Sequence, residues 1–352
     1  MNGWNQFRGD ERNRSRIDGA GLTTRPTQAW QVELSGALEC PPILDDDTVY
    51  VGSSAGNLYA FDRQGRRRWV YETTTTTTIA PAVSGYHLCL VLDDRLVGID
   101  SARGTAEWER QIDGLYTTPP TVDGNLGLVG SSDGLTAFRV EGGEEIWTRD
   151  LGSPPVGAPA VGSSHVYVAT RDEQVHALEL GSGETAWSAP TDGVVVGGPT
   201  LTDDRAYVAD DSGTLLALDP ESGQTWFSYE IRAPFASAPT VLEDRDTLLV
   251  TAADETLHIT DTTFGNRKRR GWLFSKAGLG LDGAPTTDPV CVGENAFVGD
   301  DTGGLYGVDL EDLDFTWHLP LEAPIAATPA PLAGGDLFVG DEAGVLTRLT
   351  WP

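Results

Sequence analysis

Long apolar runs and cysteine are both scarce in this sequence of 352 residues. No run approaches the roughly 18 apolar residues of a membrane-spanning helix. No apolar stretch follows the charges at the N-terminus, which argues against a secretory signal. Cys40, Cys89 and Cys291 are odd in number and far apart, so we expect reduced, buried thiols and no disulfide framework. These absences predict a soluble, cytoplasmic protein without a membrane span.

Positive charge is also scarce. Lys and Arg together number 24 against 53 Asp and Glu, a net charge of −29, and Lys268 and Lys276 are the only lysines. A field of this sign repels nucleic acid and anionic membranes and excludes them as general partners. An acidic, lysine-poor surface of this kind predicts a halophilic protein. In molar salt the Debye length is about 3 Å, so the repulsion among the carboxylates is screened. An ordinary acidic mesophilic protein is the alternative.

Tryptophan recurs at a nearly constant interval along the chain. The intervals between successive members of the series are 39, 39, 39, 40, 39, 46 and 45 residues. The series consists of Trp30, Trp69, Trp108, Trp147, Trp187, Trp226, Trp272 and Trp317. A series of prolines has the same period: Pro42, Pro81, Pro120, Pro159, Pro199, Pro239, Pro289 and Pro329. Two residue types on one period indicate a repeat architecture.

Each period contains four short segments with strand character. After Pro42 these are "ILDD", "TVYVGS", "NLYAFD" and "RRRWVYET", separated by Asp- and Gly-containing turns. Four antiparallel strands in about 40 residues make one propeller blade. The chain ends after three strands of a last blade, and residues 28–34 form a lone strand before the first complete repeat. Joining the two closes the ring, because closure removes free sheet edges.

The sequence therefore predicts an all-β, eight-bladed β-propeller in one domain over 1–352. Residues 1–27 form a lead-in, 28–34 the closing strand and 35–352 the repeats. We expect the eight tryptophans to be structural docking residues between the outer strands of neighbouring blades. Burial of 150–250 Å² of aromatic surface would contribute roughly 4–6 kcal/mol per site before entropy is counted.

The repeats resemble a known family. "AFDRQGRRRW", "ALELGSGETAW" and "ALDPESGQTW" are similar to the tryptophan-docking repeat of pyrroloquinoline-quinone-type (PQQ-like) β-propellers. "WNQFRGDERNRSR" resembles the lead-in of that group. The resemblance covers nearly the whole chain and implies the fold. It leaves function open, because the family contains quinoprotein dehydrogenases and non-enzymatic members, among them an outer-membrane assembly scaffold.

The resemblance also implies which features an enzyme of this family would carry. A quinoprotein dehydrogenase would hold calcium with carboxylate and amide oxygens, use an aspartate base and often carry a disulfide between adjacent cysteines. No two cysteines are adjacent here, and no stretch matches such a ligand set. We therefore expect no catalytic residue, no metal site and no cofactor, although quinone and calcium remain conceivable.

Other polar groups have a structural and a functional interpretation. The acidic turns at Asp210, Asp300 and Asp341 either stabilise β-turns or hold calcium, and turn chemistry suffices. The five histidines show no metal-binding spacing. The basic runs Arg66–Arg68 and Arg267–Arg270 either pair with local carboxylates or bind an acidic partner.

The loops that join one blade to the next form the best candidate site. In a propeller these loops reach toward the mouth of the central channel, and here they combine aromatic, small apolar and hydroxyl side chains. The candidate interaction surface consists of Thr76, Thr77, Tyr116, Phe235, Leu281 and Asp282. We expect a monomeric, non-catalytic scaffold that binds another protein. The alternative is a quinone-dependent oxidoreductase or another small-molecule binder that uses the channel.

Overall fold

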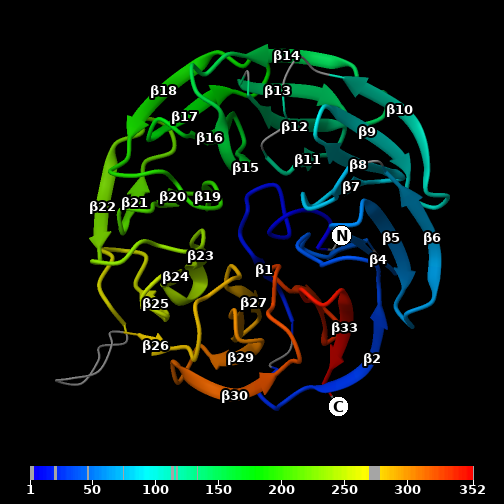
Figure 1. The fold of residues 1–352 in the computed structure, drawn as a ribbon. Coiled ribbons are helices and arrows are strands. Elements are labelled where there is room, and N and C mark those ends of the chain that lie inside the picture. The colour runs from blue at the N-terminus through cyan, green and yellow to red at the C-terminus, as the bar shows by residue number, and fades with distance from the viewer. Residues whose placement is uncertain are drawn as a thin grey trace.

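Eight small antiparallel sheets stand around a central axis in the computed structural model of the chain (Figure 1). The structure describes residues 4–19, 22–45, 47–73, 75–111, 115, 118–132, 134–268 and 278–351. Within these residues, consecutive four-stranded units follow the chain around the ring, which confirms the eight-bladed β-propeller. No helix among them is long and apolar enough to cross a membrane.

In blades 1 to 7, four consecutive strands follow one another from the axis outward (Figure 1). Blade 1 consists of β3 (Ile43–Asp45), β4 (Thr48–Gly52), β5 (Asn57–Asp62) and β6 (Arg67–Glu72), and blade 2 of β7 (Ala82–Ser84), β8 (His87–Leu92), β9 (Arg95–Asp100) and β10 (Thr105–Gln111). Blade 3 consists of β11 (Thr121–Asp123), β12 (Leu126–Ser131), β13 (Gly134–Arg139) and β14 (Glu145–Arg149), and blade 4 of β15 (Pro155–Val161), β16 (His165–Thr170), β17 (Gln174–Glu179) and β18 (Thr185–Pro190). Blade 5 consists of β19 (Thr200–Leu201), β20 (Ala206–Ala209), β21 (Thr214–Leu218) and β22 (Thr225–Glu230), and blade 6 of β23 (Thr240–Leu242), β24 (Thr247–Ala252), β25 (Thr256–Thr260) and β26 (Leu279–Gly280). Blade 7 consists of β27 (Val290–Val292), β28 (Asn295–Gly299), β29 (Gly304–Asp309) and β30 (Asp314–Pro320). A 3-10 turn, η1 (Glu243–Arg245), joins β23 to β24.

Blade 8 combines both ends of the chain. Its inner strands are β31 (Ala330–Leu332), β32 (Asp336–Gly340) and β33 (Val345–Thr350), and its outer strand is β2 (Thr27–Glu33). β2 pairs antiparallel with β33 from Thr27–Thr350 to Glu33–Val345, which confirms the predicted closing strand. A second N-terminal strand, β1 (Arg16–Ile17), pairs parallel with β27 on the axial side of blade 7.

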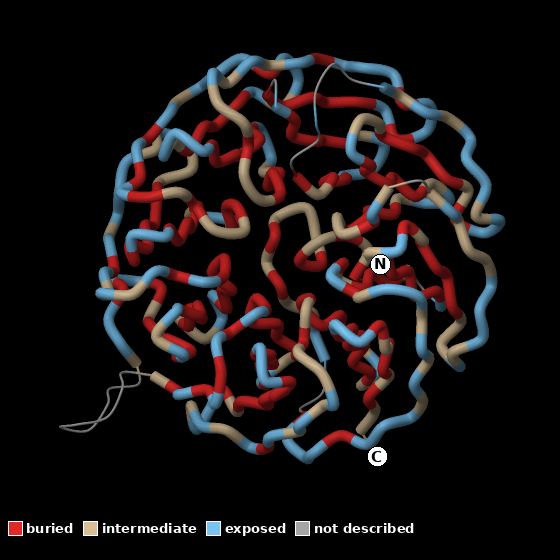
Figure 2. Tube along the Cα trace, in the orientation of Figure 1, coloured by how far each residue is buried: buried red, intermediate tan, exposed pale blue. Residues whose placement is uncertain are grey.

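Burial decreases from the middle of each blade outward (Figure 2). Strand β5 is buried over its four central residues, whereas β6 on the rim is exposed or half-buried throughout. The two central strands of a blade read as apolar runs because neighbouring blades cover both of their faces. Threonine hydroxyls tie inner strands to the next blade by donating to proline carbonyls, in the pairs Thr121–Pro159, Thr200–Pro239 and Thr240–Pro289.

Each regular tryptophan lies over the third-to-fourth-strand hairpin of the following blade. The indole Nε1 donates to a carbonyl oxygen at 2.9–3.1 Å, in the pairs Trp30–Arg63, Trp69–Ser101, Trp108–Val140, Trp147–Leu180 and Trp187–Pro220. The glycine of that hairpin has positive φ and faces the indole ring, as Gly183 faces Trp147. Blade 8 has no such hairpin, and Trp317 instead approaches the carbonyl of Leu22 at 3.5 Å.

Trp226 is an exception that corrects the sequence prediction. Its side chain is 59% exposed, and the guanidinium of Arg205 lies 4.7 Å from its ring. Phe227 pairs with Ala217 and faces Gly265 of blade 6, as tryptophan does elsewhere. Trp226 is the extra residue of a β-bulge, a position that points outward in every blade where the bulge occurs. Trp272 lies outside the described residues.

Candidate functional site: the two mouths of the axial channel

The blade topology gives the axial channel two different mouths. Successive strands of a blade run in opposite directions. The links from the outer strand of one blade to the inner strand of the next therefore all lie at one end of the channel, here called the upper mouth. The hairpins between the first and second strands lie at the opposite end, the lower mouth. The links that carry Thr76, Thr77, Phe235, Leu281 and Asp282 lie at the upper mouth. Residues 4–18 lie at the lower mouth, against the first hairpins of several blades.

At the upper mouth, only part of the predicted surface is accessible. Thr76 and Asp282 are exposed, but Thr77, Phe235 and Leu281 are 0%, 2% and 6% exposed. Tyr116 lies outside the described residues. The accessible side chains of these links are mostly charged or small and include Glu39, Asp192, Arg232, Ala236, Thr286 and Glu322. Whether this surface binds a partner stays a prediction.

The buried members serve the packing between blades. The Phe235 ring lies 6.3 Å from those of Tyr229 and His258, and Leu281 packs against Val298 of blade 7. The direction in which a link residue points depends on which side chains fill the wedge below it. Composition alone does not reveal this, so the prediction that Phe235 lies on the surface is wrong.

His258 and Tyr229 form a buried polar cluster beneath Phe235. The Tyr229 hydroxyl lies 3.1 Å from His258 Nδ1, and Asp254 lies 3.3 Å from Nε2. Arg267 donates to the tyrosine hydroxyl at 3.0 Å. Burial lowers the pKa of His258 and raises that of Tyr229, which keeps both groups neutral near pH 7. The cluster satisfies buried polar groups within the interface of blades 5 and 6.

The acidic turns of the upper face act on their own backbone. Asp300 Oδ1 accepts from the amides of Thr302 and Gly304, and its Oδ2 accepts from the Tyr306 hydroxyl at 2.8 Å. Asp210 has the same role in blade 5, where it accepts from the amides of Ser212 and Thr214. Both carboxylates also accept from an amide of the adjacent link, that of Gly283 or Gly193. These donors support the turn interpretation over a calcium loop.

The basic runs also have local partners. Arg66 and Arg68 pair with Asp62 and Asp47, each at 2.7 Å. Lys268 donates to the carbonyl of Arg245 at 2.7 Å. These contacts agree with the local-pairing interpretation.

At the lower mouth, residues 4–18, here called the axial segment, follow the inner wall of the ring. The backbone carbonyls of Trp4, Asn5, Glu11, Arg12 and Ser15 accept hydrogen bonds from amides of inner strands. The donors, in blades 1, 2, 4, 5 and 7, are Leu44, Val83, Val161, Leu201 and Cys291. The Gln6 side chain makes two hydrogen bonds with the backbone of Val122 in blade 3. The segment thus contacts successive blades in chain order.

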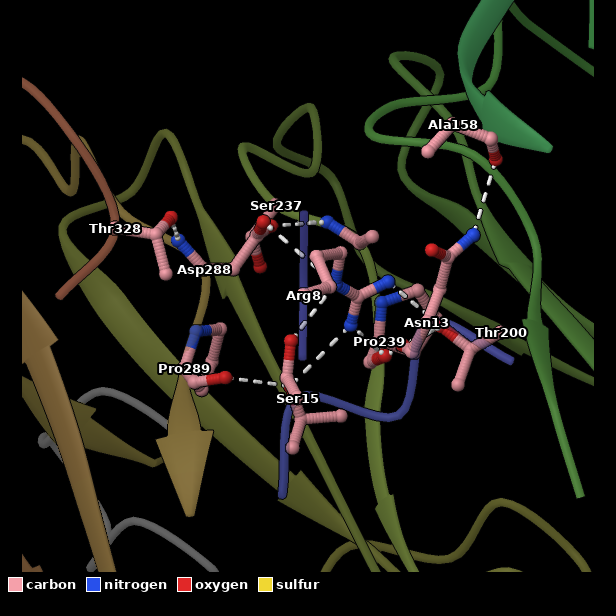
Figure 3. Close-up of polar contacts among 12 residues, drawn as sticks. Arg8, Asn13, Ser15, Ala158, Thr200, Ser237, Pro239, Asp288, Pro289 and Thr328 are labelled. Carbon is pink, nitrogen blue, oxygen red and sulfur yellow. Dashed lines mark hydrogen bonds and ion pairs between the residues drawn. The ribbon is translucent and has the colours of Figure 1, made fainter. Parts of the chain in front are cut away.

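Arg8 lies among residues of blades 5, 6 and 7 and is 1% exposed (Figure 3). Its guanidinium donates to the Thr200 hydroxyl at 2.7 Å and the Pro239 carbonyl at 2.5 Å. Asp288 of blade 7 lies 3.7 Å from its Nε. Burial lowers the pKa of Arg8 and raises that of Asp288, whereas each partner's charge acts in the opposite direction. Sequence reasoning missed this pair, although "WNQFRGD" was the marked motif.

Asn13 continues the polar wall opposite Asp288. Its Nδ2 donates to the carbonyls of Ala158 and Pro199, each at 3.0 Å (Figure 3). Its buried Oδ1 has no hydrogen-bond partner among the residues that the structure describes. Below these residues, a cavity of about 830 Å³ opens between the axial segment and the first hairpins of blades 1, 2, 3 and 6. Its lining includes Asp10, Arg14, Asp45, Asp123 and Asp244.

The oxygen atoms available in this channel as metal ligands do not fit a quinone–calcium centre. Calcium takes six to eight oxygen ligands. The axial carboxylate of Asp288 already accepts from the Ala238 amide at 2.9 Å and pairs with Arg8. Within the described residues, no three His, Cys, Asp or Glu side chains gather as a metal site would require.

Comparison with known proteins places the chain among relatives of one kind. It is 25% identical over 171 residues to the outer membrane protein assembly factor BamB of Yersinia pestis, covering 43% of each chain. It is 27% identical over 150 residues to that of Nitrosomonas eutropha, covering 40% of this chain and 36% of the other. The matches thus span less than half the length of these curated relatives.

Solved structures share the fold. The crystal structure of BamB from Moraxella catarrhalis has a TM-score of 0.77 at 19% identity, over 93% of this chain and all of the other. A europium-containing methanol dehydrogenase has a TM-score of 0.80 at 13% identity, over 99% and 98% of the two chains. At these identities the likeness shows the fold alone.

A family model adds the sequence relationship. The model described as outer membrane protein assembly factor BamB matches residues 113–196 and 182–329, more than half of the chain. With the eight-bladed fold and the repeat of four-stranded blades, this match establishes that the chain belongs to the BamB-like family of PQQ-type β-propellers.

Proposed function

We propose that this protein is a non-catalytic scaffold that binds a protein partner at the upper mouth of its channel. The observation that carries the proposal is that the polar groups inside the channel bind the protein's own chain. Arg8 donates to the Pro239 carbonyl and pairs with Asp288. The relatives are named as assembly factors, which favours a protein partner. We further propose that it works as a monomer in a salt-rich cytoplasm, a view that rests on the charge of −29.

The exposed side chains of the upper mouth are the proposed contact surface. Thr76 and Asp282 lie on the links into blades 2 and 7, and Glu39 and Glu322 add negative charge around the mouth. A surface of this kind favours a partner that offers basic and hydrogen-bonding groups, since complementary charge promotes encounter and register.

Site-specific photo-crosslinking tests the proposal. A photoreactive residue at position 76 or 282 should give one crosslinked protein of defined mass in extract of the source cells. The same residue at Glu184, exposed on a lower-side hairpin, is the control and should not give it. Equal crosslinking at all three positions, or none at the upper mouth, would count against the proposed surface.

A quinone-dependent oxidoreductase is the second candidate, favoured by the fold shared with the methanol dehydrogenase. Titration with pyrroloquinoline quinone and calcium in molar KCl, followed by the quinone absorbance, separates the two. The scaffold proposal predicts no saturable binding. Saturable binding in the micromolar range would favour the oxidoreductase.

A further inference from the structure

We infer that the lower mouth of the channel is a peptide-binding site and that the axial segment, residues 4–18, is its ligand, held there without need of the covalent link to β2. This site lies at the opposite end of the channel from the proposed partner surface. The two proposals therefore rest on different residues and can fail separately.

The first argument is the kind of contact that the ring makes with the segment. Five inner-strand amides, from Leu44 to Cys291, donate to carbonyl oxygens of the segment. These amides lie on the axial edges of the blades, where no further strand of the same blade follows. An open edge is a template for an extended peptide. Without the segment, each of these donors would lose its protein partner.

The second argument is the anchor. Arg8 reaches groups from three blades, namely Thr200, Pro239 and Asp288. Its side chain is fully buried and is surrounded by acceptors that the ring supplies, with Ser15 of the segment completing the set. A guanidinium has five donors in fixed directions, so a converging set of acceptors of this kind is specific for arginine.

The third argument is the conformation of the segment itself. Arg8, Asn13 and Ser15 all have positive φ, at 60°, 58° and 52°. Residues with side chains rarely adopt such values, and the surroundings must hold them there. All three make buried contacts, Arg8 and Asn13 to the ring and Ser15 to Cys291. The segment's own turns, such as the bond from the Ser15 amide to the Arg8 carbonyl, and its contacts with the ring together hold this shape. A peptide that takes up a defined conformation on a matching site behaves in this way.

The fourth argument is the link that follows. Asp18 and Gly19 are exposed at the end of the segment, and residues 23–25 before β2 are exposed as well. The closing strand is fixed separately by its ladder with β33. The link can therefore be cut while both the segment and the closed ring keep their own contacts.

The test uses the complete chain with a protease recognition sequence inserted after Gly19. The folded protein is cleaved, and size exclusion with mass spectrometry shows whether residues 1–19 stay associated. A fluorescent peptide of residues 1–19 is then exchanged into the cleaved protein, and its affinity is measured by anisotropy. We expect the segment to remain bound after cleavage and the labelled peptide to replace it saturably.

Variant peptides test the anchor. Arg8→Gln should weaken binding at least about tenfold, because it removes charged hydrogen bonds to buried acceptors. The matched control is Arg14→Gln, since Arg14 is half-exposed and pairs with Asp10 of the segment itself. The control should stay within about threefold of the natural peptide, as expected for an exposed pair.

Two results would overturn the inference. In one, the segment leaves on cleavage and the free peptide does not bind. In the other, the Arg8→Gln peptide binds as tightly as the natural one. Only peptides are varied in the second comparison, so that result cannot be attributed to a misfolded ring. For the first, the cleaved protein is compared with the uncleaved one by size exclusion and thermal unfolding, and loss of the segment from a ring that stays folded overturns the inference. Crosslinking at the upper mouth is unaffected by either outcome.

Discussion

Trp147 of blade 3 donates a hydrogen bond from its indole to the carbonyl of Leu180 in blade 4, at 3.0 Å. The bond joins two blades whose interface also contains apolar side chains and the hydrogen bond from Thr121 to the Pro159 carbonyl near the axis. The same geometry recurs around the ring, from Trp30 to Trp187. Interfaces between blades are thus tied at the rim, whereas the axial segment ties them at the centre.

Truncation of a docked tryptophan should be costly. Trp147→Ala is expected to lower the free energy of unfolding by about 3–5 kcal/mol, because it leaves a cavity and an unpaired carbonyl. Trp226→Ala is the control and should cost about 1 kcal/mol or less, since this residue is 59% exposed and its partners, Arg205 and Asp219, contact it at the rim. Denaturant unfolding in molar KCl measures both. Similar costs for the two variants would contradict the docking arrangement.

The hairpin glycine beneath the indole should be equally sensitive. Gly183 has φ +69°, and a Cβ added there would lie 2.5 Å from Cε3 of Trp147. Gly183→Ala should therefore cost about 2 kcal/mol or more through backbone strain and overpacking. Gly181, in the same hairpin, has open space around it, so Gly181→Ala should be neutral. Thermal unfolding of the two variants compares them directly, and equal melting temperatures would refute this account.

The ring was accessible to sequence reasoning because its signals are local and repeated. A period carried by Trp and Pro fixes the number of blades, and the incomplete last blade identifies residues 28–34 as the missing strand. The misassigned Trp226 also had a visible signal. Docked tryptophans follow their hairpin glycine by four residues, as Trp187 follows Gly183, whereas Phe227 holds that position after Gly223.

The axial site had no such signal. Arg8 donates to the hydroxyl of Thr200 and the carbonyl of Pro239, which are far from it in sequence and meet it only when the ring closes. Backbone carbonyls are present at every residue, so no pattern marks those that will face the axis. For the same reason the burial of Phe235 and Leu281 depends on the finished interface between blades, not on the composition of their loops.

The buried histidine predicts how stability depends on pH. Burial lowers the pKa of His258 below its ordinary value of 6.5, so the unfolded chain takes up this proton first as the pH falls. Stability should therefore decline from about pH 6.5 downward, by at most about 1.4 kcal/mol per pH unit for this group. His258→Gln should reduce that dependence. Thermal unfolding between pH 7.5 and 5.5 compares the variant with the natural protein, and identical slopes would contradict the assignment.

The charge of −29 predicts a response to salt. Repulsion among carboxylates destabilises the compact state, and raising KCl from about 0.1 M to 2 M should screen it. We expect the melting temperature to rise with salt over this range. Some salts also strengthen the burial of apolar surface, as neutral osmolytes do. A neutral osmolyte is therefore the control, because it strengthens burial without screening charge. A melting temperature independent of KCl would contradict the prediction of a halophilic protein.

The closing strand gives the last prediction. Deletion of residues 28–34 removes β2, which covers the outer edge of β33 along six paired residues from Thr27 to Glu33. The exposed edge would present unpaired amides and carbonyls, so the product should associate or aggregate in molar KCl. Size exclusion with light scattering measures the mass of the product. The control exchanges Glu33 for Gln, which keeps the ladder and should leave a monomer. A soluble, monomeric deletion product would mean that the ring stays closed by its inner contacts, those of the axial segment among them.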